Sequence, residues 1–265
     1  MKYSVTVGVL LALPLAIDAA PAAFSSPGTI AINDSANPPT KATPYPSAIV
    51  LTGLTGQLVT KVTVTLDGFS HQFPDDVDIL LVGPQGQKAV LMSNVGGSTP
   101  GYSVTNLTLT LDDDAANSLP LEAPLTSGTF QPTRRLPYLL FDFPPPAPPG
   151  SSNALASLSV FKNTNPNGTW SLFVVDDTNP DSGSIAGGWS ITVSTMPVLL
   201  SITQAETNVV ISWTNALAGF NLQTAPSLSS SAVWTNALPP PVVVSGQFMV
   251  TNSIVGGSRF YRLKK

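Results

Sequence analysis

Hydrophobic and polar residues alternate along many short stretches of this chain, a pattern that predicts β-strands rather than helices. In the segment "KVTVTLDG", which begins at Lys61, valine and leucine alternate with threonine and aspartate, as in a half-buried strand. Asn106–Leu111 repeats the pattern. Further strands are expected at Ala48–Thr52, Val77–Val82, Ala89–Met92, Leu158–Phe161 and Trp189–Val193. Roughly eight short strands without a helical period predict an all-β fold, a jelly-roll-like β-sandwich.

Two stretches refine this picture. In "TWSLFVVD", from Thr169 to Asp176, both faces of the expected strand are largely apolar, which predicts a central, buried position in a sheet. The stretch from Asp112 to Gly150 is long and rich in proline, and we expect it to form an extended connection across the sandwich.

A second unit is expected to begin near Pro197. Residues 197–265 contain strand patterns of their own, starting at Asn208, Gly219 and Arg259, which suffice for a small C-terminal β domain. The sequence "WTNAL" occurs at Trp213 and again at Trp234. We interpret the two tryptophans as core residues on two strands, since buried tryptophan commonly anchors small β cores.

The N-terminus has the layout of an export signal. Lys2 precedes an apolar run from Val5 to Ile17, and "APA" at Ala20–Ala22 fits a cleavage site, so residues 1–22 are predicted to be a removed signal peptide. The chain has 0 Cys, which excludes disulfides and suits a bacterial extracellular or envelope protein. No later segment is long and apolar enough for a membrane helix. We therefore expect a secreted or extracellular protein. Association with the cell surface is an alternative.

Composition narrows the classes of partner. Hydrophobic residues make up 43% of the 265 residues and charged residues 10%, which indicates a folded chain rather than a disordered one. A net charge of -4 with only 11 Lys and Arg provides no basic stripe for a phosphate backbone, so no nucleic-acid partner is expected.

Aspartate is the residue type that could carry chemistry. Carboxylates at strand ends and turns suit Ca²⁺, which takes about six to eight oxygen ligands. An Asx-rich turn is an equally good interpretation of the later segment, because Asp and Asn also bond their own backbone. For a third group, Asp112–Asp114, we expect a solvated loop. The candidate calcium ligands are Asp75, Asp76, Asp78, Asp176, Asp177, Asn179 and Asp181.

Enzyme chemistry has little support in the sequence. His71 is the only histidine, and the chain has neither a Gly-x-Ser-x-Gly elbow nor a cysteine nucleophile. Zinc ligation lacks a His or Cys partner for His71. We expect His71 to be structural, hydrogen-bonded to a nearby aspartate or turn carbonyl. Aspartate content alone leaves a carboxylate-pair glycosidase open.

The two aspartate segments also carry a family resemblance. The stretch "HQFPDDVDILLVGPQG" from His71 resembles the His, Gly-Asp-Leu turn, strand and Ser-Pro-x-Gly turn of the P (Homo B) domain of subtilisin-like proprotein convertases. A later series resembles its Gly-x-Trp-x-Leu-x-Val-x-Asp, Asp-x-Gly and Trp motifs: Gly168, Trp170, Leu172, Val174, Asp176, Asp181, Gly183 and Trp189. The first turn has Asp75 where the family has Gly, and "FKNTNPNG" replaces the segment that convertases place before Gly-x-Trp.

The resemblance covers residues 27–195 and implies a non-catalytic β-sandwich that often works with calcium. The convertase protease domain has no counterpart here, so its protease role is not carried over. Residues 197–265 resemble short C-terminal β modules of bacterial secreted proteins, which implies sorting or surface association. The expected function is a secreted, non-catalytic, calcium-stabilised module that binds a cell-envelope or polysaccharide ligand. The alternatives are a carbohydrate-active hydrolase with an unrecognised carboxylate site and a structural envelope protein; oligomeric state is not specified.

Overall fold

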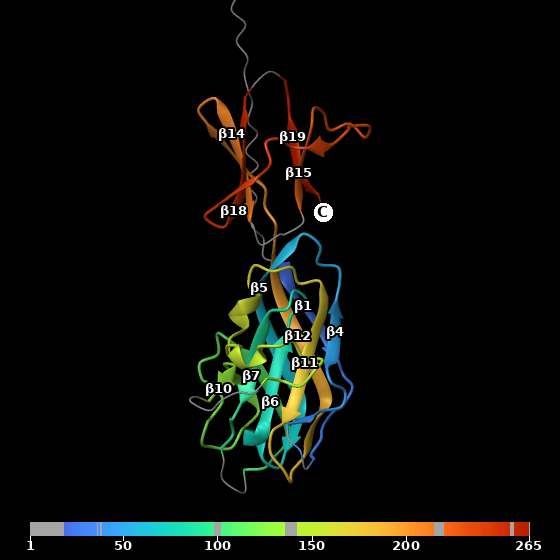
Figure 1. Ribbon diagram of the computed structural model, residues 1–265, viewed down its shortest axis with the longest axis vertical. Coiled ribbons are helices and arrows are strands. Elements are labelled where there is room, and N and C mark those ends of the chain that lie inside the picture. The colour runs from blue at the N-terminus through green and yellow to red at the C-terminus, as the bar shows by residue number, and fades with distance from the viewer. Residues whose placement is uncertain are drawn as a thin grey trace, which may run out of the picture. The chain divides into compact units, whose positions relative to one another are not determined.

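The computed structural model describes residues 19–35, 37, 39–97, 102–135, 142–214, 220–254 and 257–264. These residues belong to two compact units, the first ending at Met196 and the second beginning at Pro197. Strands dominate both units (Figure 1), and the helical segments of the described residues are short 3-10 turns.

Sheet A of the first unit has six strands, in the order β1-β12-β5-β8-β9 with β2 paired to β12. Among them, β5 and β12 are the longest, at 15 residues each. The strands are Ala19–Ser26 (β1), Ile30–Ile32 (β2), Gln57–His71 (β5), Val104–Asp112 (β8), Gly128–Phe130 (β9) and Gly183–Pro197 (β12).

Sheet B also has six strands, in the order β10-β7-β6-β11-β3 with β4 paired to β11. The neighbours β6 and β11 run antiparallel and lie side by side in Figure 1. As the apolar pattern on both of its faces predicts, β11 is interior to its sheet. The strands are Thr40–Lys41 (β3), Ser47–Leu51 (β4), Val77–Val82 (β6), Lys88–Ser93 (β7), Thr133–Arg134 (β10) and Gly168–Asp176 (β11).

The main hydrophobic core lies between the two sheets. It combines side chains of both, such as Val64 and Ile191 of sheet A with Ile79 and Trp170 of sheet B. The predicted fold class is confirmed: the chain is all-β, with a β-sandwich followed by a small C-terminal β domain.

A second, smaller core covers the other face of sheet B, which we call its outer face. Phe173 and Val175 of β11 pack there with Leu80 of β6. Phe143 and Ala147 from the proline-rich connection complete this core. The described part of that connection therefore crosses the outer face of sheet B and buries the part formed by β6, β7 and β11, while Val50 of β4 stays exposed.

A β-bulge in β5 decides which way the end of that strand faces. Val62, Val64 and Leu66 are buried at alternate positions, but the register with β8 shifts between Leu66 and Phe69. Gly68 lies inside the shift with a φ of +73°, a conformation that glycine adopts without strain. The extra residue moves the inward positions from even to odd numbers, so Phe69 and His71 are buried.

Among the described residues, three 3-10 turns interrupt the strands, and one of them corrects a prediction. Leu158–Phe161, expected as a strand, forms the turn η3. Its apolar residues Leu158 and Phe161 still face the core. Residues three positions apart lie on the same side of a 3-10 turn, so the turn can bury both. The other two turns are Pro74–Asp76 (η1) and Ser151–Asn153 (η2).

The described residues of the second unit form two small sheets, with strand orders β13-β14-β18-β17 and β16-β15-β19. Its core includes Ile211, Trp213, Leu222 and Val250. The strands are Ser201–Ala205 (β13), Asn208–Thr214 (β14), Asn221–Ala225 (β15), Thr235–Asn236 (β16), Val242–Val244 (β17), Gln247–Ser253 (β18) and Phe260–Lys264 (β19).

The two tryptophans of the second unit differ in environment. Trp213 is buried in the core, as predicted. Trp234 is half-buried and precedes β16, where its ring contacts the guanidinium of Arg262 at 4.3 Å. The prediction that both tryptophans are core residues is wrong for Trp234.

The start of the described chain overlaps the predicted signal peptide. β1 begins at Ala19 and pairs with β12, with Ala22 opposite Val193 and Ser26 opposite Trp189. The remainder of residues 1–22 lies outside the described residues. Over the described part of the chain, no helix has the length and apolar character that crossing a membrane requires.

Candidate cation site at the aspartate end of the sandwich

Two aspartate segments about 100 residues apart in the sequence meet at one end of sheet B. The cause is the antiparallel pairing of β6 and β11, which puts Val77 opposite Asp176. Beyond the ladder, the Asp177 N–H donates to the Asp76 carbonyl at 2.9 Å. We call this region the aspartate end; its acidic residues are Asp75, Asp76, Asp78, Asp176, Asp177 and Asp181.

His71 forms a buried pair with one of these aspartates. Its Nε2 lies 3.0 Å from Oδ2 of Asp176, and both side chains are completely buried. The Phe73 N–H donates to Nδ1 of His71 at 3.1 Å, so the ring proton belongs on Nε2, which donates to Asp176. The other Asp176 oxygen, Oδ1, accepts the N–H of Thr178 at 3.1 Å. The expected hydrogen bond between His71 and a nearby aspartate is confirmed.

Asp181 approaches the other side of the histidine ring. Its Oδ1 lies 3.6 Å from Nδ1 of His71, beyond hydrogen-bonding distance, and is buried without a hydrogen-bond partner. Oxygen or nitrogen atoms of His71, Asp176 and Asp181 lie within 4.8 Å of one another. These residues form an acidic group around a histidine between the two sheets.

Asp75 and Asp78 also have buried oxygen atoms without partners. Asp78, in β6, is 1% exposed, and neither of its carboxylate oxygens has a hydrogen-bond partner among the described residues. Oδ1 of Asp75 is likewise buried without a hydrogen-bond partner among the described residues. Leaving a buried polar group unpaired costs about 1–3 kcal/mol, and more for a charged group, so such atoms indicate a place for a ligand.

Burial and mutual repulsion shift the acidity of this region. Burial raises the pKa of Asp76 to about 7, and the charges of Asp181 and Asp177 add to the shift. Burial likewise raises the pKa of Asp78 to about 8, an effect that Ser93 and Arg134 offset in part.

The remaining shifts have the same direction. Burial raises the pKa of Asp177 to about 6, although the Thr178 hydroxyl opposes the change. It also raises the pKa values of Asp75 and Asp181. The carboxyl groups of the aspartate end therefore ionise less readily than ordinary aspartates. A bound cation would stabilise their ionised form.

Asn179, the one predicted ligand that is not an aspartate, is exposed. Its Nδ2 donates to the Ser35 carbonyl at 3.3 Å, which ties its loop to the segment after β2. That hydrogen bond is a structural role for the side chain, and it leaves the amide oxygen available.

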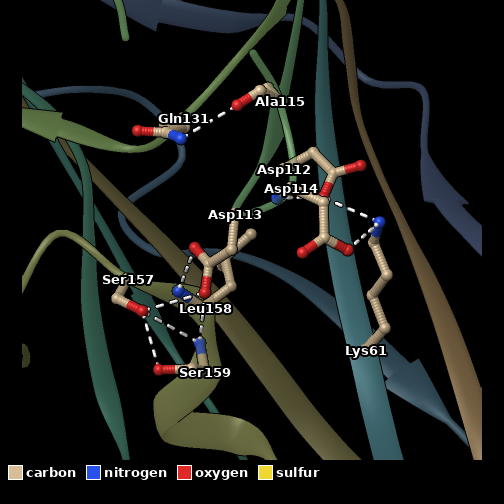
Figure 2. A network of polar contacts seen from close by, with 9 residues as sticks. All are labelled: Lys61, Asp112, Asp113, Asp114, Ala115, Gln131, Ser157, Leu158 and Ser159. Atoms are coloured by element: carbon tan, nitrogen blue, oxygen red, sulfur yellow. Dashed lines mark hydrogen bonds and ion pairs between the residues drawn. The ribbon is translucent and has the colours of Figure 1, made fainter. Parts of the chain in front are cut away.

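The third acidic group, Asp112–Asp114, is more ordered than the predicted solvated loop (Figure 2). Asp113 accepts the N–H of Leu158 and of Ser159, each at 2.8 Å, and so fixes the start of η3. Lys61 Nζ lies 2.9 Å from Asp112 Oδ1 and 2.7 Å from Asp114 Oδ2. The loop prediction holds only for Asp114, which is exposed.

A cavity of about 280 Å³ lies beside this third group. Lys61, Asp113, Ser159 and Lys162 are among its lining residues. Its lining includes no residue of the aspartate end.

No protein-family model matches this chain, and no curated protein or solved structure does either.

Proposed function

We propose that this chain is an exported, non-catalytic β-sandwich protein that binds Ca²⁺ at its aspartate end and serves as a binding or surface-association module. The observation that carries the proposal is the set of buried, unpartnered carboxylate oxygens on Asp75, Asp78 and Asp181. Oxygen ligands of this kind, drawn from a turn and two strand ends, are what a hard divalent cation prefers. The resemblance to convertase P domains is in keeping with this role.

Calcium dependence of thermal stability tests the cation. The purified protein is melted in a calcium buffer and in a chelator, with Mg²⁺ as a second condition. A ligand that binds only the folded state stabilises it by about 2.7 kcal/mol at 100 times its Kd, so we expect a clear rise in Tm with Ca²⁺. Equal melting temperatures in calcium and chelator would show that the metal prediction is wrong.

A matched pair of variants locates the effect. Asp76→Asn removes a carboxylate of the aspartate end, and we expect it to reduce the calcium-induced rise in Tm. Asp114→Asn removes an exposed carboxylate that pairs with Lys61, and the calcium response should stay as in the wild type. An equal loss in both variants would indicate nonspecific screening of negative charge rather than a site.

The ligand of the module is tested by calcium-dependent binding to polysaccharides and cell-envelope fractions. We expect retention that a chelator reverses and that Asp76→Asn weakens. Retention that persists in the chelator would show that surface association does not depend on the cation.

One observation favours a second function, a carbohydrate-active hydrolase. The pKa of Asp76, raised to about 7 beside Asp181, is that of a carboxyl able to act as a general acid. Hydrolysis of a polysaccharide that disappears in Asp76→Asn would establish this function and overturn the non-catalytic one. Without such activity over a panel of polysaccharides, the hydrolase proposal fails.

A further inference from the structure

The cavity beside Asp112–Asp114 is separate from the aspartate end. Strand β5 contributes Thr60, Lys61 and Val62 to its lining, and the neighbouring strand β12 contributes Ser194. The turn after β8 and the η3 segment supply the rest of the lining. Four segments that are distant in the sequence therefore line one space of about 280 Å³, all within the first unit.

A network of polar contacts holds the walls of this cavity in place (Figure 2). Asp113 accepts two backbone N–H groups of η3, each at 2.8 Å. On the side of β5, Lys61 Nζ lies 2.9 Å from Asp112 Oδ1 and 2.7 Å from Asp114 Oδ2. The turn after β8 is thereby fastened to both η3 and β5. A site that is formed before its ligand arrives loses less conformational entropy on binding, which favours affinity.

Three polar side chains of the lining have no partner among the described residues. The hydroxyl groups of Thr60 and Ser194 and the ammonium group of Lys162 make no hydrogen bond or ion pair there. Each can therefore bond a ligand without breaking a contact. Val62 and Leu158, both members of the main core, add an apolar part to the lining. Apolar surface with a few converging polar groups is the usual composition of a small-molecule site.

The charges of the lining favour a neutral ligand over an anion. Two lysines, Lys61 and Lys162, are balanced by two carboxylates, Asp113 and Asp114. Asp112 adds a further negative charge beside Lys61. An anion would therefore meet no excess of positive charge. A neutral ligand with hydroxyl groups, which both donate and accept hydrogen bonds, matches the free hydroxyl and ammonium groups of the lining.

We propose that this cavity binds one sugar ring of a neutral polysaccharide, with Thr60, Lys162 and Ser194 bonding its hydroxyl groups. Ligand pockets usually measure roughly 300 to 1,000 Å³, and the cavity lies just below that range, so one ring suits it better than a longer segment. The C–H groups of the ring contact Val62 and Leu158.

This inference rests on the proposed function as a binding module and names the ligand class and its site. The sugar does not touch the aspartate end, so calcium affects its binding through the stability of the sandwich and not through a direct contact.

An NMR titration of the full-length protein in calcium buffer tests the site. The neutral probes are cellotriose, laminaritriose, maltotriose and mannotriose, and trigalacturonic acid is the anionic comparison. We expect at least one neutral trisaccharide to cause saturable shifts of the backbone amide signals of Thr60, Lys162 and Ser194. The amide signals of the aspartate end should not move.

Variants identify the groups that contact the sugar. Thr60→Val removes one hydroxyl group, and we expect it to weaken binding roughly three- to tenfold, which corresponds to one hydrogen bond. Lys162→Met should weaken binding roughly tenfold, because a hydrogen bond from a charged donor is stronger. Thr63→Val is the matched control: Thr63 is a half-buried threonine of the same strand that does not line the cavity, and its loss should leave the affinity unchanged. All three variants should melt near the wild-type temperature, because none of them removes a hydrogen bond within the protein.

The outcomes separate this inference from the proposed function. Absence of binding to every neutral trisaccharide would overturn the inference, while the calcium-induced rise in Tm tests the cation independently. Retention on polysaccharides that Thr60→Val and Lys162→Met leave unchanged would keep the proposed function and overturn only the cavity as its site. Binding of trigalacturonic acid alone would contradict the neutral ligand. A wild-type protein without retention on any polysaccharide or envelope fraction would overturn both the binding module and the cavity site.

Discussion

Aspartates with the same side chain have opposite roles in this protein because their surroundings differ. Asp113 accepts two backbone N–H groups and is a structural residue. Asp78 is buried on the outer face of sheet B, where neither oxygen makes a hydrogen bond of normal geometry and the Ser93 side chain offsets its burial only in part. The sequence analysis names Asp78 a candidate ligand and expects Asp113 in a solvated loop, but the capping role of Asp113 depends on neighbours about 45 residues away, which the sequence does not reveal.

The raised pKa values of the aspartate end predict an unusual pH dependence of stability in the metal-free protein. Asp177, Asp76 and Asp78 have folded-state pKa values of about 6, 7 and 8, all above the ordinary value of 3.8 for aspartate. Between about pH 4 and pH 8, these three carboxyl groups are therefore protonated to a greater extent in the folded state than in the unfolded state. Its stability from these groups is fully present below about pH 4 and is lost as the pH rises through 6 to 8.

Chemical denaturation in chelator from pH 5 to 8.5 measures this effect, and we expect the free energy of unfolding to fall over that interval. Asp78→Asn is the control, since it should flatten the upper part of the decline. A free energy that rises over the same interval would contradict the assigned direction of the pKa shifts.

At the level of elements, alternation of apolar residues predicted the strands well because one face of each sheet packs on the core. The segment Leu158–Phe161 was mispredicted since two apolar residues three positions apart fit either a strand or a turn. The Ser157 hydroxyl caps this turn locally by accepting the Ser159 N–H, and Asp113, 45 residues earlier, accepts the Leu158 N–H. A contact of that separation leaves no local signal in the sequence.

The inward orientation of His71 was likewise hidden from simple alternation. Continuing the pattern of Val62, Val64 and Leu66 would place odd-numbered positions on the other face of sheet A. The bulge at Gly68 reverses this assignment. A glycine that interrupts an alternating strand is itself a bulge signal, so this part of the site could have been found from the sequence.

The contact between Asp113 and η3 gives a prediction at the element scale (Figure 2). Asp113→Ala removes the acceptor for two backbone N–H groups, and we expect the free energy of unfolding to fall by about 1–3 kcal/mol. Urea denaturation measures the change. Asp114→Ala, in the same loop, loses only an exposed ion pair with Lys61, which water and salt screen, and should cost much less than Asp113→Ala. An equal decrease in the free energy of unfolding in the two variants would show that the hydrogen bonds of Asp113 to η3 do not contribute to stability beyond the removal of one negative charge.

For the whole molecule, the sequence predicted the fold class and the acidic segments, but not which of their residues pair. The meeting of the two segments follows from the adjacency of β6 and β11, and adjacency depends on the folding of the entire sandwich. Which of these aspartates faces the core and which faces outward depends further on strand register. A shift of one residue would exchange the two faces, which is why residue spacing alone did not specify it.

The last prediction concerns the independence of the two units. The main core and the C-terminal core share no residue, and the aspartate end belongs entirely to the first unit. Trp213→Ala should therefore destabilise the second unit by about 3–5 kcal/mol, because it empties the largest side chain of a small core. The calcium-induced rise in Tm of the first unit should remain unchanged.

Calorimetric melting of the full-length protein with and without Ca²⁺ measures both effects. Trp234→Ala is the matched control, since Trp234 is only half-buried and its loss should lower the second transition less. If Trp213→Ala also abolished the calcium response, the two units would unfold as one cooperative system, because domains with separate cores otherwise melt separately.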